Sequence, residues 1–498
     1  KLRAFILKRT RSAFVPSTVY RLQLNRDFTF RQAAAVAPSL AELGVEAVYC
    51  SPYFQAAPGS LHGYNVTDPN RLNPEIGSPD DYAKFCDALA EHGLTQIADV
   101  VPNHMGVTGN NNRWWHDVLE NGPASPYAPY FDIDWKPVKP ALWGKVLLPV
   151  LGNFYGRVLE NREIQLAYAG GEFSAHYYDH RFPLDPGTYP VLLEAGAGEL
   201  ERRLGPEHPD FLEYLSIVTA FRNLPPAAEC PPDRMRERRR EKEIAKRRLD
   251  ILAARSETVR DFLAARLAFF NGNKADPRSF DPLDRLLNAQ PYRLAFWAVA
   301  SQEINYRRFF DINELAAVRI EEEEVFRHYH DLLFRLIAEG KIKGLRIDHP
   351  DGLYDPPRYF SRLQREYLLK MLLSEEAQRA GPGAALPDID QEAVRKSLED
   401  LLSREFASSL ALYVVAEKIL DRREHLPENW NIHGTVGYDF LNALNGLFVD
   451  NRHEEAFARL YEAYIGHGID FAQLLYNKKK LFALVPMASE ISALGHRL

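Results

Sequence analysis

The sequence predicts an α/β fold built from parallel βαβ units, of the (β/α)8-barrel type, and three observations lead to this prediction. Short β-rich runs alternate with helical segments through the first hundred residues. The same alternation resumes after residue 343. Polar residues follow directly on several of the apolar runs, which is where a barrel of this type places its chemistry.

The first three predicted strands cover residues 17–24, 45–51 and 95–101, and each carries a run of β-branched or aromatic residues. Helical periodicity separates them over residues 30–43 and 78–91. Gly44 stops the first helix, whereas Ser78 caps the start of the second and Gly93 ends it. This spacing of strand and helix is typical of parallel βαβ units.

The alternation then breaks for about 230 residues. Residues 105–335 begin as a segment rich in Pro, Gly, Tyr and Trp, and they become mostly helical from about residue 209. Strands are predicted again over residues 343–347 and 411–416, with a sixth over 435–440. We therefore expect three parts: residues 1–104 with the first three βα units of a catalytic barrel, an insertion over 105–335, and a continuation of the barrel, apparently truncated, over 336–498.

Three local stretches have plain interpretations. Residues 374–399 contain Gly381, Pro382 and Gly383 and are expected to form an exposed excursion. The run 234–248 holds nine Lys or Arg against three Glu, and it is interpreted as a solvated helix face. Residues 321–324, four glutamates, receive the same interpretation.

Composition narrows the class of protein. The chain has 498 residues, 46% apolar and 26% charged, which excludes a disordered or fibrous protein. Its net charge of −7 is too small to indicate a nucleic-acid or acidic-membrane partner. Cys50, Cys86 and Cys230 have no disulfide or zinc spacing, which favours a reducing cytoplasm. No apolar run resembles a signal-peptide core or approaches the roughly 20 residues of a membrane span.

Charged and polar side chains follow the predicted strands. The candidates for a functional site are, in chain order, His62, Tyr64, Asp99, Asn103, His104, Arg346, Asp348, His349 and Glu417. Arg346 and Asp348 lie two residues apart on one strand, so they point to the same face. A cation beside a carboxylate keeps it ionised, which suits a nucleophile.

Glu417 follows an apolar strand, so we expect a raised pKa that keeps its carboxyl protonated as an acid. Two carboxyls in different environments are what retaining glycoside chemistry requires. The residues alone therefore indicate a sugar-processing site.

These motifs resemble the signature regions of the α-amylase superfamily of glycoside hydrolases and transglycosylases. Residues 99–104 (DVVPNH) are similar to the first region, 344–348 (GLRID) to the second, and Glu417 to the third. Within that superfamily the chain resembles the maltooligosyltrehalose synthase family from residue 16 to about 485. The segments that carry the narrower resemblance are 20–24 (YRLQL), 51–53 (SPY), 62–69 (HGYNVTDP), 304–311 (INYRRFFD), 346–353 (RIDHPDGL) and 434–440 (GTVGYDF).

The resemblance implies a role for each of the central residues. Asp348 is the nucleophile that forms a β-glycosyl-enzyme, and Glu417 is the general acid and then the base. Arg346 holds Asp348 ionised. Asp99 either supports Arg346 from below or is purely structural. No cofactor is implied.

For the sugar in the −1 subsite, the resemblance implies stacking on Tyr64 and a hydrogen bond from its 6-hydroxyl to His104. Tyr64 as simple loop packing is the alternative. His349 either lines the acceptor side or caps its strand, and His62 is left undecided in the same way. Asn103 corresponds to a calcium ligand of many amylases, but this family is not generally regarded as calcium-dependent, so no metal is expected.

The implied activity is an intramolecular transglycosylation that converts the reducing-end α-1,4 linkage of a maltooligosaccharide into an α,α-1,1 linkage. The implied substrates are glycogen-derived α-1,4-glucans, and a maltooligosyltrehalose trehalohydrolase is the implied pathway partner. The insertion would then wall a dry +1 pocket, and reshaping it would change the ratio of trehalose-ended product to free glucose. The alternatives are an α-1,4-glucan hydrolase, a 4-α-glucanotransferase, or an inactive glucan-binding fragment.

One part of the superfamily pattern is missing. Its fourth region, a His-Asp pair after the seventh strand, supplies a third carboxylate, yet none of the five His residues beyond Glu417 is followed by Asp. No seventh or eighth strand is evident either. We therefore expect the chain to be the N-terminal two-thirds or so of such an enzyme, with low turnover on its own.

Overall fold

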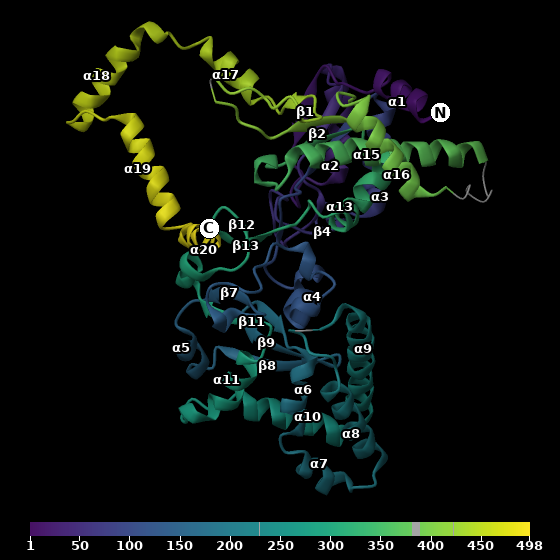
Figure 1. Cartoon of the computed structure of the whole chain (residues 1–498), viewed down its shortest axis with the longest axis vertical. Helices are drawn as coiled ribbons and strands as arrows, with labels where there is room; N and C mark the ends of the chain where they lie inside the picture. Colours follow the sequence, from purple (N-terminus) through teal and green to yellow (C-terminus); the bar gives the residue numbers. More distant parts are fainter. Residues whose placement is uncertain (229, 381–388, 422) are drawn as a thin grey trace. The chain divides into compact units, whose positions relative to one another are not determined.

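The chain divides into two units in its computed structural model (Figure 1). A six-stranded parallel sheet forms the centre of the first unit. The structure describes residues 1–228, 230–380, 389–421 and 423–498. The first unit comprises residues 1–106 and 318–474, and the second comprises 107–317 and 475–498. Relative to the expected insertion at 105–335, the second unit ends earlier and gains a C-terminal segment.

The sheet contains the six strands that the sequence predicts, in the order of the chain. They are β1 (Val19–Leu22), β2 (Ala47–Cys50), β5 (Thr95–Val100), β14 (Gly344–Ile347), β15 (Tyr413–Ala416) and β16 (Gly434–Thr435). Every neighbouring pair is parallel. Each strand is shorter than predicted, at its first residues, at its last residues or at both ends.

The sixth strand shows the largest difference from the prediction over 435–440. Its pairing covers only Gly434 and Thr435, and helix α17 (Tyr438–Gly446) begins three residues later. Gly437 adopts φ of 95°, a left-handed conformation that ends the extended backbone. Helices α17, α18 (Glu454–Ile465) and α19 (Phe471–Leu484) bury none of their side chains, so they add nothing to a core.

The helices of the first unit begin where sequence signals place them. Ser78 Oγ accepts from the Asp81 N–H at the start of α3, and Thr29 with Gln32 forms a capping box on α2. The helices are α1 (Leu2–Arg11), α2 (Phe30–Glu42), α3 (Pro79–Glu91), α13 (Glu323–Tyr329), α14 (Asp331–Ala338), α15 (Pro356–Ala380) and α16 (Gln391–Arg404). The expected excursion at 374–399 is helical at both ends, and Gly381, Pro382 and Gly383 lie outside the described residues.

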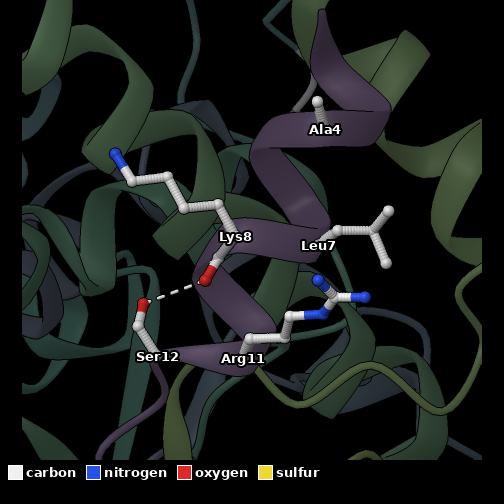
Figure 2. A pocket seen from close by; sticks show the side chains of 5 residues that line it. All are labelled: Ala4, Leu7, Lys8, Arg11 and Ser12. Carbon is white, nitrogen blue, oxygen red and sulfur yellow. Dashed lines mark hydrogen bonds between the residues drawn. The ribbon is translucent and has the colours of Figure 1, made fainter.

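Helix α1 is anchored to this unit by Phe5 and Ile6, which pack with Leu368 and Leu398 of α15 and α16. Its opposite face lines the shallow hollow shown in Figure 2, where the side chains belong to Ala4, Leu7, Lys8, Arg11 and Ser12. The Ser12 hydroxyl donates to the Lys8 carbonyl at 3.0 Å. The lining of this hollow comes from helix α1 and the residue after it, and it includes no carboxyl side chain.

The second unit combines small sheets with helices. β7 (Val146–Leu151) pairs in parallel with β11 (Tyr292–Phe296), whereas β8 (Ile164–Ala169), β9 (Glu172–Tyr177) and β10 (His180–Pro183) form an antiparallel meander. β12 (Arg308–Phe309) and β13 (Ile312–Ala317) form a hairpin. The helices are α4 (Arg113–Asn121), α5 (Tyr155–Glu160), α6 (Tyr189–Glu194), α7 (Ala197–Leu204), α8 (Pro209–Arg222), α9 (Pro232–Arg255), α10 (Glu257–Phe270), α11 (Asp281–Asn288), α12 (Ala300–Glu303) and α20 (Ala488–Arg497).

The basic run 234–248 is not only a solvated face, contrary to the prediction. It lies on α9, and Arg238, Lys242 and Lys246, spaced four residues apart, are all buried. Lys242 and Lys246 both bind the buried carboxylate of Glu120 on α4. Although burial opposes ionisation, the two ammonium groups hold the pKa of Glu120 at about 2.

Glutamates 321–324 also differ from a plain solvated face, because Glu323 binds Arg362 at 3.1 Å and Arg365 at 2.5 Å. Short strands β3 (Phe54–Ala56), β4 (Val66–Leu72) and β6 (His104–Gly106) complete the first unit. Among the described residues, no helix combines the length and the apolar character needed to cross a membrane.

His330 predicts a pH dependence of folding stability. The ring is fully buried: Nδ1–H donates to the Phe326 carbonyl at 2.8 Å, so neutral Nε2 accepts from the Tyr359 hydroxyl at 2.9 Å. Burial lowers its pKa to about 4. The unfolded chain, with an ordinary His pKa near about 6.5, binds the proton first, so stability falls as pH drops from about 6.5 to about 4, by up to about 3 kcal/mol.

The measurement is urea unfolding across this pH range for the wild type, His330→Leu and the exposed control His92→Gln. We expect His330→Leu to be less stable at neutral pH but to lose most of the slope. The control should keep the wild-type slope. An unchanged slope in His330→Leu would show that other groups cause the dependence.

Candidate active site

The carboxyl ends of three neighbouring strands place the charged residues together. Asp99 on β5 is in register with Arg346 on β14, and Arg346 is in register with Val415 on β15. Asp348 and Glu417 each lie two residues further along their chains. The backbone ladder continues to them, since Asp348 N–H donates to Val100 O at 2.8 Å and Glu417 N–H donates to Ile347 O at 2.9 Å.

Arg346 is the hub of this cluster. Its Nη1 donates to Asp99 Oδ1 at 2.8 Å and to Asp348 Oδ1 at 2.5 Å, and its Nη2 lies 3.1 Å from Glu417 Oε2. Arg346, Asp99 and Asp348 are all buried. One guanidinium therefore orients three carboxyls at the carboxyl-terminal edge of the sheet.

The charges of the cluster do not balance. One cation faces three carboxyls, so full ionisation would leave two uncompensated negative charges in a buried site. Burial raises the pKa of Asp348 well above its usual range, against the opposing effect of Arg346, and the neighbouring Asp99 and Glu417 raise it further. The pair Asp348 and Glu417 therefore retains a proton near neutral pH.

The preferred site of that proton is opposite to the one predicted from the sequence. Burial by itself would raise the pKa of Glu417, but Arg346 and the His349 N–H bring it below its usual value. The Glu417 side chain also keeps 27% exposure, whereas that of Asp348 keeps 9%. In this arrangement Asp348 is the protonated partner, because it is the more deeply buried of the two.

Two phenols hold the second oxygen of Asp99. The Tyr64 hydroxyl donates to Asp99 Oδ2 at 2.8 Å, and the Tyr49 hydroxyl donates to the same atom at 2.7 Å. Burial and the nearby Asp99 charge raise the pKa of Tyr64 to about 12, so its phenol stays a donor. Tyr64 thus has a contact within the site beyond simple loop packing.

The loop that carries Tyr64 is set by His62 and Gly63. The His62 ring stacks on Tyr64 with centroids 6.0 Å apart and 19° between the planes, and His62 Nδ1 accepts from the Tyr64 N–H at 3.0 Å. Gly63 has φ of 81°, and a Cβ there would lie 2.2 Å from the Pro52 carbonyl oxygen. Only glycine fits this approach, so the turn presents Tyr64 toward Asp99.

His349 contributes through its backbone. It adopts φ of 43° and ψ of 53°, a left-handed conformation that is disfavoured for a residue before proline. This conformation aims its N–H at Glu417 Oε2, at 2.9 Å. The ring lies beside Gly352, where an added Cβ would be 2.5 Å from His349 Cδ2 and 2.6 Å from Asn103 Oδ1.

Asn103 and His104 follow β5 and are buried side by side, with Asn103 Nδ2 and His104 Nδ1 3.3 Å apart. The predicted contact of His104 with a sugar hydroxyl stays a prediction, and so does a part for Asn103 in the site. Within the described part of the chain, no group of three or more His, Cys, Asp or Glu side chains is arranged to hold a metal ion.

Three residues that lie in or beside this site are not singled out as site residues by the sequence. Tyr49 binds Asp99, and Arg21 stacks over the Tyr49 ring with its guanidinium carbon 5.4 Å from the centroid. Burial and then the nearby Glu417 charge raise the pKa of Tyr438, in the first turn of α17. Strand alternation could have found Tyr49 and Arg21, since each points to the same face as Asp99 and Arg346.

Comparison with known proteins extends this picture. Residues 38–182 match the family model described as the catalytic domain of alpha amylase. A protein from Mycobacterium tuberculosis, described as "putative maltooligosyl trehalose synthase", is 28% identical over 97% of this chain. The chain is similar to the maltooligosyltrehalose synthases. This confirms the resemblance that the motifs indicate.

Solved maltooligosyltrehalose synthases support the same fold. The enzyme from Arthrobacter ramosus is 29% identical, covers 96% of this chain and aligns with a TM-score of 0.63. The structure of a hypothetical maltooligosyl trehalose synthase from Sulfolobus tokodaii is 26% identical over 96% of this chain, with a TM-score of 0.60. The predicted barrel fold of the α-amylase type is thereby confirmed.

The similarity covers less than half of each relative. This chain spans 45% of the Mycobacterium tuberculosis protein, 44% of the Arthrobacter ramosus enzyme and 45% of the Sulfolobus tokodaii protein. The roles of Arg346, Asp348 and Glu417 therefore rest on their geometry in this chain.

Removal of the hub cation should destabilise the fold in a pH-dependent way. In Arg346→Met, the buried carboxyls of Asp99 and Asp348 and the partly exposed one of Glu417 lose their counter-charge. We expect a loss of about 3 kcal/mol or more in the free energy of unfolding. Their folded-state pKa values then lie above the unfolded ones, so the loss grows as pH rises from about 5 to about 8.

Urea unfolding at the two pH values tests this, with Arg319→Met as the control. Arg319 binds Glu321 at 3.3 Å with a side chain that is 39% exposed, and its loss should cost at most about 1 kcal/mol. Equal losses in both variants would contradict the central role of Arg346.

Proposed function

We propose that this chain serves an intramolecular transglycosylation, in which the reducing-end α-1,4 linkage of a maltooligosaccharide becomes an α,α-1,1 linkage. The observation that carries the proposal is the pair Asp348 and Glu417, which one guanidinium holds at the carboxyl-terminal edge of a parallel sheet. The similarity to proteins named maltooligosyltrehalose synthases, over nearly the whole chain, supports it.

The first step breaks the terminal glycosidic bond. Asp348 attacks the anomeric carbon of the sugar in the −1 subsite, and Glu417 protonates the oxygen that leaves with the reducing-end glucose. The bond between that carbon and the glycosidic oxygen breaks as the bond to the Asp348 carboxylate forms. Tyr64, which lies against Asp99, is the proposed stacking surface for the ring.

The second step uses the released glucose as acceptor. Glu417 removes the proton from the anomeric hydroxyl of that glucose, and the hydroxyl oxygen attacks the glycosyl-enzyme, which frees Asp348. Two inversions retain the α configuration at the −1 carbon. The result is a non-reducing α,α-1,1 end, provided that water does not compete as the acceptor.

The shared proton must move before the first step. The arrangement favours the proton on Asp348, whereas the mechanism needs it on Glu417. Both carboxyls contact the same guanidinium, that of Arg346, so the transfer is local. Positive charge that develops at the anomeric carbon favours the ionised form of Asp348, and a glycosidic oxygen beside Glu417 accepts the proton.

The proposed substrates are α-1,4-glucans of the kind released from glycogen, and the proposed site of the reaction is the cytoplasm. Cys50, Cys86 and Cys230 are all unpaired, which fits a reducing compartment. A trehalose-ended product has no reducing end, so an enzyme that hydrolyses such an end, a maltooligosyltrehalose trehalohydrolase, is the proposed partner in sequence.

Incubation of the complete gene product with maltopentaose distinguishes this activity from its alternatives. We expect the reducing-end signal to fall while the chain length stays at five glucose units, because the linkage changes without loss of a sugar. Mass spectrometry and a reducing-sugar assay measure both quantities. Shorter products would indicate a hydrolase, and a ladder of shorter and longer chains would indicate a 4-α-glucanotransferase.

The same assay tests the nucleophile. Asp348→Asn should lower kcat at least about 10⁴-fold, because the amide cannot form the glycosyl-enzyme. Asp355→Asn is the matched control, since Asp355 Oδ1 accepts from the Arg358 N–H at the start of α15 and Asn caps helices equally well. Retained transglycosylation in Asp348→Asn would rule out the assignment.

The shared proton also predicts a bell-shaped dependence of kcat/KM on pH. Activity requires one proton on the carboxyl pair, so it falls at acid pH when a second proton binds and at alkaline pH when the shared proton leaves. Because burial raises the pKa of Asp348, the alkaline limb should lie well above the ordinary carboxyl range. A rate that stays constant from acid to alkaline pH would contradict the single shared proton.

A further inference from the structure

We propose that Tyr49 is a positioning residue of this site: its phenol fixes the Asp99 carboxylate so that Asp99 aligns Arg346 with Asp348 and Glu417. The effect on turnover rests on the proposed function, whereas the contact between Tyr49 and Asp99 does not. Tyr49 is assigned no contact with substrate, and its direct hydrogen bond in the cluster is to Asp99.

Both oxygens of Asp99 are committed. Oδ1 accepts from Arg346 Nη1 at 2.8 Å, and Oδ2 accepts from the Tyr49 hydroxyl at 2.7 Å and from the Tyr64 hydroxyl at 2.8 Å. A carboxylate with donors on both oxygens cannot rotate about its χ2 angle without breaking one set. The two phenols therefore fix the plane of the Asp99 carboxylate, and with it the direction in which Oδ1 points toward the guanidinium of Arg346.

The sheet itself directs Tyr49 to this place. Tyr49 on β2 is in register with Arg21 on β1 and with Ile97 on β5, and Asp99 lies two residues beyond Ile97. Side chains two apart on a strand share a face. The neighbours Val48 and Cys50 are fully buried on the other face, so a shift of the strand by one residue would exchange them with Tyr49.

The hydroxyl of Tyr49, rather than its ring, is the group that helps to keep the Asp99 carboxylate ionised. Asp99 is 1% exposed, and a buried carboxylate needs donors to stay ionised. Burial raises the pKa of Asp99, and the contacts with Arg346, Tyr49 and Tyr64 oppose that rise. Arg21, whose guanidinium carbon is 5.4 Å from the Tyr49 ring centroid, holds the ring from the side of β1.

The two phenols on Asp99 differ in what else they can touch. Tyr64 comes from the loop between β3 and β4 and is the proposed stacking surface for the substrate. Tyr49 comes from within a strand. Loss of the Tyr64 hydroxyl is therefore expected to change both KM and kcat, whereas loss of the Tyr49 hydroxyl changes kcat and its pH dependence at constant KM.

The first test compares Tyr49→Phe with the wild type at saturating maltopentaose. We expect kcat to fall about tenfold to a hundredfold, as for the loss of a hydrogen bond to a charged group, with KM within about twofold. The acid limb of the kcat/KM profile should move to higher pH. Asp99 then accepts a proton more readily, and its protonation, which releases Arg346, precedes the second protonation of the carboxyl pair. A wild-type kcat and an unmoved acid limb would overturn the proposal.

Tyr53→Phe is the matched control. The Tyr53 ring is 1% exposed, and its hydroxyl donates to Gln96 Oε1 at 2.5 Å, outside the carboxyl cluster. The Tyr53 hydroxyl also lies 3.5 Å from the Tyr82 hydroxyl, so this variant too loses buried phenol contacts and should lower stability to a similar degree. It should leave the pH profile in place, and an equal displacement of the acid limb in both variants would mean that Tyr49 has only a structural role.

The second test needs no activity. Urea unfolding of the wild type, Tyr49→Phe, Asp99→Asn and the double variant forms a double-mutant cycle. We expect Tyr49→Phe to cost less than half as much in the Asp99→Asn background, because the contact is already lost there. Additive losses would overturn the proposal. Coupled losses in a chain without any transglycosylation would refute the proposed function and leave the Tyr49 contact standing.

If Asp99→Asn fails to fold, infrared difference spectra of the wild type, Tyr49→Phe and Tyr53→Phe supply the same information. Tyr49→Phe should show a carboxylic-acid C=O band that titrates at higher pH than in the wild type. Tyr53→Phe should match the wild type. The absence of any new titrating band in Tyr49→Phe would overturn the proposal.

Discussion

The whole site depends on the attraction between one guanidinium and three carboxyls. Arg346 lies on β14, between the strand that carries Asp99 and the strand that precedes Glu417. Parallel register therefore delivers all three acids to one cation, with no long loop needed to bring them together. Since a buried charge without a partner costs several kcal/mol, the position of Arg346 also constrains how these strands can pair.

A second buried ion cluster shows what is particular about the first. On α9, Lys242 and Lys246 both bind Glu120, the most deeply buried carboxylate among the described acids that pair with them. Two cations on one buried carboxylate keep it ionised and join helix α9 to α4. Around Arg346, by contrast, a single cation serves two buried carboxyls and the partly exposed Glu417, and this excess of acid keeps a proton in the site.

Much of this arrangement can be predicted from local sequence, and the exceptions have physical causes. Alternation and capping residues locate the strands of the sheet and helices α2 and α3, but the buried lysines of α9 look like their solvated neighbours because burial depends on distant partners. The contact of Tyr49 with Asp99 depends on strand register across 50 residues. The order of the pKa values of Asp348 and Glu417 depends on depth of burial, which no motif records.

The backbone of His349 has a consequence for how such a site is studied. The donor that it offers to Glu417 is an N–H, held in place by a left-handed conformation ahead of Pro350. Replacement of the side chain leaves that donor present, so a scan of side-chain substitutions would find only a modest effect on activity at this position. The φ and ψ angles of His349 determine this hydrogen bond. Its contribution would be measured only by a change of the backbone conformation, or by an ester in place of the amide, which removes the N–H.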